Sequence, residues 1–155
     1  MFPLERILLP TDFSEASRQS LAVAADMASD YGAELLIVHV IEPLPAVPPD
    51  PDFTFEMAAY QDAVSQYSDE RMAELLAGLD ETLAVRTMVC HGEPAREIVR
   101  LAENEDVDLI VIPTHGLTGL KHLVFGSVAE RVVRTACCPV LTLRRLSSAS
   151  QAGEE

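Results

Sequence analysis

Short apolar segments alternate with segments of helical periodicity throughout this chain of 155 residues. The apolar segments have the length of strands, and they occupy residues 6–10, 33–41, 83–90, 108–113 and 139–144. Between them, apolar residues recur three and four positions apart, as Leu21, Ala24 and Ala28 illustrate. This alternation predicts one α/β domain with a single doubly wound sheet of five parallel strands, and the strand order that we expect is 3-2-1-4-5. Helices cover both faces of this Rossmann-like sheet.

Capping residues set the expected limits of three helices. Ser14 is expected to cap a helix that ends near Tyr31-Gly32, where Gly is a usual C-terminal residue. Gly92-Glu93-Pro94 is expected to begin another helix, with Pro in its first turn. The last helix is expected over residues 127–136, because Ser127 to Glu130 has the S-x-x-E form of a capping box.

Five prolines between Pro43 and Pro51 predict a long loop before the remaining helix. That helix is expected over residues 56–79. Its apolar positions are Tyr60, Val64, Tyr67, Met72, Leu75, Leu76 and Leu79. The domain is expected to span residues 1–146, and the polar tail over residues 147–155 is expected to be frayed and disordered.

The charge balance restricts the partners of this chain. It has 11 Lys and Arg against 25 Asp and Glu, a net charge of −14, which repels the phosphate backbone of nucleic acids. A bound triphosphate therefore needs backbone N–H groups, a helix N-terminus or a metal ion. With 48% hydrophobic residues and no Trp, the core is expected to be aliphatic.

The three cysteines, Cys90, Cys137 and Cys138, do not resemble a disulfide framework. Free thiols in a reducing cytosol are the simpler interpretation, and Cys137 and Cys138 are expected to be buried and inert. No basic segment followed by an apolar segment opens the chain, and no apolar run approaches the roughly 20 residues of a membrane span. We therefore expect a cytoplasmic protein without a membrane partner.

Candidate ligand-binding residues follow the strands, because open parallel sheets bind ligands at their carboxyl edge. Pro10, Thr11 and Asp12 end the first strand, and Val40 lies at the end of the second. Pro113, His115 and Gly116 follow the fourth, and Gly126-Ser127 then opens a helix. Gly126-Ser127 is the strongest single feature, because a helix N-terminus presents N–H groups to a phosphate and Gly permits close approach. An ordinary helix cap is the alternative for this dipeptide.

Two nucleotide-binding motifs are absent from the sequence. It contains no G-x-x-x-x-G-K-[ST], which excludes a P-loop NTPase. It contains no G-x-G-x-x-G either, which disfavours a dinucleotide-dependent dehydrogenase.

The segments that flank these candidates resemble one protein family. Residues 7–14, ILLPTDFS, are similar to the opening of universal stress proteins. Thr114-His115-Gly116, nine further residues, then Gly126 to Glu130 and Cys138 to Leu141 resemble the C-terminal signature of that family. ATP-binding members carry G-x2-G-x9-G-[ST]; Gly116, Gly126 and Ser127 match it, and Pro113 occupies the first glycine position. The resemblance extends from about Arg6 to Arg144.

This resemblance implies an adenine nucleotide alpha hydrolase-like fold and ATP, with Mg²⁺ carried by the nucleotide. It implies hydrogen bonds from the ribose or adenine to Asp12, a backbone contact from Val40 to adenine, and Ile112 near the base. It implies phosphate contacts for Gly116, Gly126, Ser127, Val128 and His115. For these residues the alternatives are a turn (Asp12), core packing (Val40, Ile112) and a solvated loop (His115, and also Lys121 and His122).

The sequence is compatible with three functions. The first is a cytoplasmic stress-response or regulatory protein that binds ATP or a related adenine nucleotide and acts on a protein partner. The second is a member of the same family that binds no ATP and acts through its surface, as a homodimer paired through the edge strand Val140–Arg144. The third is a small enzyme using Asp12 or His115, which we do not expect, because no catalytic constellation is visible.

Overall fold

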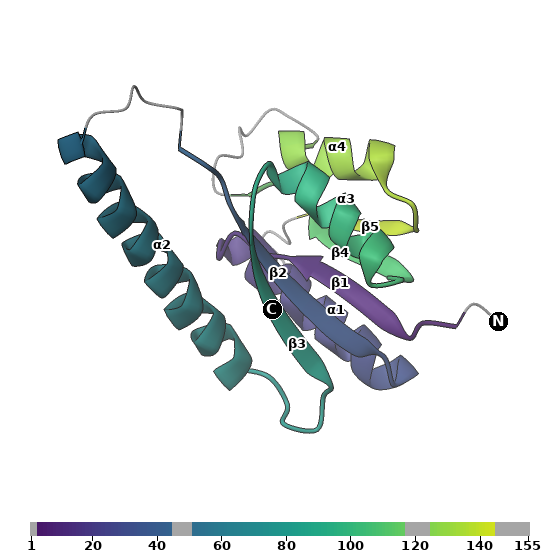
Figure 1. Ribbon diagram of the computed structural model, residues 1–155. Coiled ribbons are helices and arrows are strands. Elements are labelled where there is room, and N and C mark those ends of the chain that lie inside the picture. Colours follow the sequence, from purple (N-terminus) through teal and green to yellow (C-terminus); the bar gives the residue numbers. More distant parts are fainter. Residues whose placement is uncertain (1–2, 45–50, 117–124, 145–155) are drawn as a thin grey trace, which may run out of the picture.

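The computed structural model describes residues 3–44, 51–116 and 125–144. Residues 45–50 of the proline-rich loop, Lys121, His122 and the tail over residues 147–155 lie outside the described residues, so the expectations for them stay predictions. Strands and helices alternate in the predicted order (Figure 1). The elements are β1 (Arg6–Pro10), α1 (Glu15–Tyr31), β2 (Glu34–Ile41), α2 (Pro51–Ala77), β3 (Val85–His91), α3 (Pro94–Asn104), β4 (Leu109–Pro113), α4 (Ser127–Thr135) and β5 (Val140–Leu143).

The five strands form one sheet in the order β3-β2-β1-β4-β5, and every pairing is parallel. This confirms the predicted strand order and fold class. Strand β1 is central, with Leu8 opposite Leu36 of β2 on one side and opposite Ile110 of β4 on the other. The chain therefore reverses its direction of winding at β1, as a doubly wound sheet requires.

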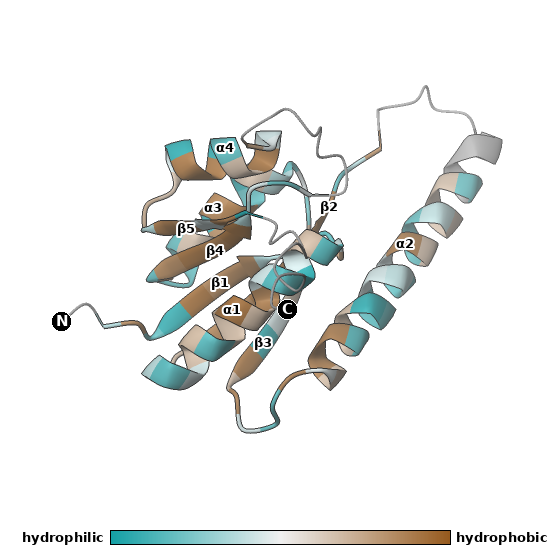
Figure 2. Cartoon of the chain, turned by 180° about the vertical axis from the view of Figure 1, so that it is seen from behind, coloured by the Kyte–Doolittle hydropathy of each residue, from teal (hydrophilic) through white to brown (hydrophobic). Residues whose placement is uncertain are grey.

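Both faces of the sheet are apolar, because successive side chains of a strand point to opposite faces and both are covered. One face carries Ile7, Leu9, Leu35, Ile37 and Val111, and it packs against α1 and the C-terminal half of α2. The other face carries Leu8, Leu36, Val38, Ile110 and Ile112, and it packs against α3 and α4. The hydropathy view shows β1 and β4 as mostly hydrophobic, whereas the edge strand β3 and the helices mix hydrophobic and hydrophilic residues (Figure 2).

Helix α1 begins and ends where the sequence predicts. The hydroxyl oxygen of Ser14 accepts a hydrogen bond from the backbone N–H of Ser17, which makes Ser14 the N-cap. Gly32 ends the helix with φ of +67°, and its N–H reaches the carbonyl oxygens of Ala28 and Ser29. A left-handed residue in this position satisfies the last carbonyl groups of a helix.

Helix α2 departs from the prediction in two respects. It begins at Pro51 rather than near residue 56, because Pro is accommodated in the first turn, where no intrahelical N–H bond is required. In addition, Tyr60 and Tyr67 are half-exposed and Leu76 is also exposed, although they belong to the apolar pattern. The N-terminal half of α2, which contains Tyr60, extends away from the sheet beside β3 (Figure 1), whereas Tyr67 lies in the C-terminal half and packs edge-on against Phe13.

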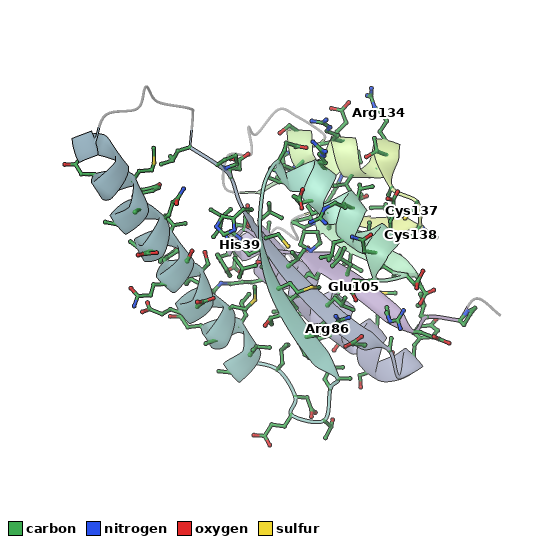
Figure 3. The ribbon with its side chains drawn as sticks, in the orientation of Figure 1. His39, Arg86, Glu105, Arg134, Cys137 and Cys138 are labelled. Atoms are coloured by element: carbon green, nitrogen blue, oxygen red, sulfur yellow. The ribbon has the colours of Figure 1, made fainter. Side chains whose placement is uncertain are left out.

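Ion pairs tie the amino edge of the sheet together. Arg86 of β3 contacts Glu34 of β2 at 3.2 Å and Glu105 after α3 at 2.7 Å (Figure 3). The pKa of Arg86 is raised, mainly by its hydrogen bond to Glu105. These groups are partly exposed, so they orient the edge more than they stabilise the fold. Among the described residues, no helix combines the length and hydropathy needed to cross a membrane.

The helix end at Gly32 allows a direct test of the fold. We expect Gly32→Ala to lower the free energy of unfolding by about 1 kcal/mol, because an L-residue is strained at positive φ. An added Cβ would meet no atom within 4 Å, so the effect reports backbone strain alone. Gly78→Ala is the matched control and should be neutral or stabilising by about 0.5 kcal/mol in urea denaturation. Equal effects at both positions would contradict this assignment.

Candidate functional site

The carboxyl ends of β1 and β4 lie side by side at the centre of the sheet. Helix α1 leaves β1 toward one face, and α4 covers the other face after β4. The segments that follow the two strands therefore diverge at this point, and such a switch point is where open α/β sheets bind ligands. The topology brings Asp12, Gly116 and Gly126 to this edge, although Asp12 is more than 100 residues from both glycines in the chain.

The turn from β1 into α1 holds the Asp12 carboxylate in a defined position. Its Oδ1 accepts hydrogen bonds from the backbone N–H of Ser14 at 3.0 Å and from the hydroxyl of Ser17 at 3.1 Å. Thr11 is buried, and its N–H donates to the carbonyl oxygen of Val38 on β2 at 2.8 Å. The turn is thus anchored on both α1 and the sheet, with Asp12 as one of its hydrogen-bonding residues.

Gly116 and Gly126 allow the segments around the switch point to approach closely. A Cβ added at Gly116 would overlap Oδ2 of Asp12. A Cβ added at Gly126 would lie 3.2 Å from the carbonyl oxygen of Thr114, closer than most real Cβ contacts. Side chains at these two positions would therefore separate the Asp12 turn, the segment after β4 and the start of α4.

The start of α4 differs from the predicted capping box. Gly126 is the N-cap, with φ of −71°, and it makes no side-chain cap hydrogen bond. Ser127 is exposed and is the first residue of the helix, one position later than the box requires. Glu130 instead pairs with Arg134 at 2.6 Å.

The N-terminus of α4 also differs from those of α1 and α3. Ser14 caps α1, and the carboxylate of Glu93 accepts hydrogen bonds from Ala95 and Arg96 at the start of α3. The glycine cap of α4 supplies no such acceptor. The first-turn N–H groups of α4 and its positive dipole end are therefore not occupied by a side-chain cap.

Pro113 fits into β4 without loss of a hydrogen bond to β5. The N–H groups of Ile110 and Thr114 donate to the carbonyl oxygens of Pro139 and Leu143 on β5. Backbone direction alternates along a strand, so residue 113 faces away from β5 and its missing N–H removes no bond there. The buried Pro113 is therefore compatible with the strand at the position where the glycine motif has its first Gly.

The other predicted site residues lie around this edge with different exposure. Pro10 is buried and pairs with Val38, and Ile112 is buried in the core, which fits the core alternative for that side chain. Val40 and Val128 are half-buried and pack against the same face as α3 and α4. His115 is half-buried, and its Nδ1 lies 3.1 Å from the hydroxyl oxygen of Thr114.

An aromatic cluster beside Asp12 was not anticipated from the sequence. The Phe13 ring lies 4.5 Å from the ring of His39 and 6.4 Å from that of Tyr67, centroid to centroid. Nδ1 of His39 lies 2.8 Å from the carbonyl oxygen of Thr11, to which it donates (Figure 3). The sequence signal was present, since His39 interrupts an otherwise apolar strand, but a strand pattern alone does not identify the partner of a polar side chain.

The cysteines are free thiols, and one expectation about them is wrong. Cys137 is exposed and Cys138 is half-buried in the connection from α4 to β5. Burial raises the pKa of Cys138 to about 11, with a smaller contribution from the neighbouring Cys137. Burial also raises the pKa of Cys90. Among the described residues, no group of three or more His, Cys, Asp or Glu side chains is arranged to hold a metal ion.

Strand order and switch point define the class as a doubly wound α/β domain, with a candidate ligand-binding edge between β1 and β4. The family model for the universal stress protein family matches residues 3–144, so this chain belongs to that family. A universal stress protein of Thermus aquaticus is 36% identical over 138 residues, which are 89% of this chain and 97% of that protein. Universal stress protein MJ0531 of Methanocaldococcus jannaschii is 32% identical over 142 residues, 91% of this chain and 82% of its own length.

Solved structures share the fold. The structure of protein MJ0577 superposes with a TM-score of 0.83 and 28% identity, covering 94% of this chain and 99% of that one. A universal stress protein in complex with cAMP gives a TM-score of 0.59 at 22% identity, over 90% of this chain and 95% of that one. The Archaeoglobus fulgidus protein in complex with dAMP gives 0.57 at 22% identity, over 92% and 98%. At that identity the last two show the fold alone.

The backbone at Phe13 provides a test of the Asp12 turn. Phe13 has φ of +63°, so we expect Phe13→Gly to be more stable than Phe13→Ala by about 1 kcal/mol. Both variants lose the aromatic ring, so their difference isolates the backbone conformation. The same comparison at the exposed helical residue Ala73 should have the opposite sign, because Gly weakens a helix. Urea denaturation measures both, and a Phe13→Ala variant as stable as Phe13→Gly would refute a left-handed residue here.

Proposed function

We propose that this protein binds an adenine nucleotide, ATP with its Mg²⁺, at the edge between the β1–α1 turn and the N-terminus of α4. The observation that carries the proposal is the glycine-capped start of α4, which lies against the Thr114 and His115 backbone next to the Asp12–Gly116 contact. A helix N-terminus without a side-chain cap, beside glycine residues that carry no Cβ, is suited to a phosphate group.

Phosphate binding through backbone groups also fits the charge of the chain. With a net charge of −14, the protein as a whole repels a triphosphate. The N–H groups of Ser127 and Val128 and the Ser127 hydroxyl would supply local donors that add no formal charge. Mg²⁺ would reach the site on the phosphates, where it neutralises part of their charge, since it is commonly held through substrate phosphates.

The ribose and base would lie toward β1 and β2. Asp12 would accept hydrogen bonds from the ribose or adenine, and the Val40 backbone at the end of β2 would contact the base. Family members in complex with cAMP and dAMP support an adenine nucleotide as the ligand class. The ATP-type spacing of Gly116, Gly126 and Ser127 supports a triphosphate within that class.

The role we propose is regulatory binding in the cytoplasm during stress, with a protein partner, rather than catalysis. Among the described residues, the site offers the Asp12 carboxylate as an acceptor, and the Ser127 hydroxyl and backbone N–H groups as donors. His115 contacts the adjacent Thr114, and this geometry by itself does not activate a nucleophile toward phosphate. The proposed output is therefore the bound state itself.

Gly126 tests the proposal. Gly126→Val should weaken ATP binding by about tenfold or more, because its side chain would crowd Thr114 and His115 and cover the start of α4. Calorimetric titration with ATP and Mg²⁺ measures the affinity, and circular dichroism checks the fold. Val133→Ala, at an exposed position of the same helix, is the control and should bind as the parent chain does.

Two outcomes would contradict nucleotide binding at this edge. One is a parent chain that neither retains nucleotide on purification nor binds ATP in the titration. The other is a folded Gly126→Val variant with unchanged affinity. If that variant does not fold, Ser127→Ala removes only an exposed hydroxyl and should still weaken binding measurably.

A second candidate function, homodimerisation through β5, is favoured by the exposed edge of the sheet. Strand β5 pairs with β4 on one side, and each of its four residues is half-exposed. The carbonyl groups of Pro139 and Leu143 face β4, so by alternation the backbone groups of Val140 and Thr142 face outward. Such an edge can pair with a second copy of the same strand.

Thr142→Pro tests this interface. We expect the variant to be monomeric, because Pro removes an outward N–H that pairing would use, whereas edge strands tolerate Pro. Thr142→Val keeps the N–H and should remain dimeric. Light scattering after size exclusion distinguishes these states, and a parent chain that is monomeric at high concentration would exclude the dimer.

A further inference from the structure

The connection between α4 and β5 contains two adjacent thiols. Helix α4 ends at Thr135, with Ala136 as its C-cap, and β5 begins at Val140. Cys137 and Cys138 fill this short connection, at the end of α4 opposite to Gly126 (Figure 3). They therefore lie outside the proposed nucleotide site.

The two side chains have complementary environments. Cys137 is exposed, so a small oxidant reaches its sulfur directly. Cys138 is half-buried and packs against the core under α3 and α4. The two residues are consecutive in the chain, and the neighbouring Cys137 contributes to the raised pKa of Cys138. Cys90 is elsewhere, on β3, and is half-buried.

We infer that Cys137 and Cys138 form a redox-sensitive dithiol in which peroxide oxidises Cys137 and Cys138 then closes a reversible disulfide. Exposure selects Cys137 as the residue attacked first, and adjacency in the chain selects Cys138 as the residue that resolves the product. This modification site lies outside the proposed nucleotide site.

Two steps convert the Cys137–Cys138 dithiol into a disulfide. The Cys137 thiolate attacks one oxygen of hydrogen peroxide, the O–O bond breaks, and sulfenic acid and hydroxide form; hydroxide takes a proton to become water. The Cys138 sulfur then attacks the Cys137 sulfur, an S–S bond forms, and the hydroxyl group leaves with the Cys138 proton as water. In total two thiols lose two electrons and two protons, and one peroxide becomes two waters.

The direction of this sequence follows from the two environments. Burial, Cys137 and Asp108 raise the pKa of Cys138, so this residue is held as a thiol at neutral pH and is a poor first nucleophile. Once Cys137 is oxidised, the second step is intramolecular, because Cys138 is the next residue in the chain. Adjacent Cα atoms are about 3.8 Å apart, below the usual disulfide range, so the product is expected to be reduced easily.

Peptide mapping of the full chain tests the inference. The folded protein is treated with millimolar hydrogen peroxide, the reaction is stopped with catalase, and remaining thiols are alkylated after denaturation. Trypsin then releases residues 135–144 with both Cys137 and Cys138, and residues 87–96 with Cys90. We expect peptide 135–144 to lose two hydrogens and escape alkylation, while peptide 87–96 remains alkylated. Dithiothreitol should reverse the change.

Single variants assign the two roles. Cys137→Ser should slow thiol loss from peptide 135–144 by about tenfold or more, because only the protonated Cys138 remains. Cys138→Ser should stop at a Cys137 sulfenic acid that dimedone traps, and Cys90→Ser should behave as the parent chain. The inference is overturned if Cys90 oxidises as fast as the pair, if Cys137→Ser reacts at the parent rate, or if peptide 135–144 stays fully alkylated.

Discussion

The pairing of β1 with β4 at the centre of the sheet is the constraint on which the rest of the structure depends. Both strands are buried on both faces, so each must lie between two helix layers. Right-handed crossovers then send α1 to one face and α4 to the other. The same pairing brings Asp12 against Gly116, so the arrangement that buries the core also assembles the candidate site.

In a chain with a net charge of −14, an anion site at this edge would depend on backbone N–H groups and a helix N-terminus, with any metal ion carried by the ligand. Asp12 is committed through Oδ1 to the N–H and hydroxyl groups of the α1 start. The start of α3 is occupied by Glu93, which also pairs with Arg131 of α4 at 3.4 Å. The glycine cap leaves the α4 dipole available in a way that the caps of α1 and α3 do not.

Helix α4 connects three surfaces of different chemistry. Its N-terminus borders the proposed nucleotide edge, its C-terminus leads into the Cys137–Cys138 connection, and β5 follows as the free edge of the sheet. Val132 is fully buried on the side of α4 that faces the sheet, and it holds the helix against the sheet between these surfaces. A change at one end of such a short, anchored helix is therefore close to the other two, although each surface works by its own chemistry.

Local sequence patterns predicted the alternation of strands and helices and the α1 caps, because apolar periodicity, Ser14 and Gly32 act locally. Tertiary structure decided what local pattern cannot encode, namely which faces find a partner. Tyr60 is exposed because the N-terminal half of α2 extends away from the sheet, and Cys137 is exposed in the connection before β5. His39 packs on Phe13, which is a contact between segments distant in the chain, and Gly126 rather than Ser127 caps α4.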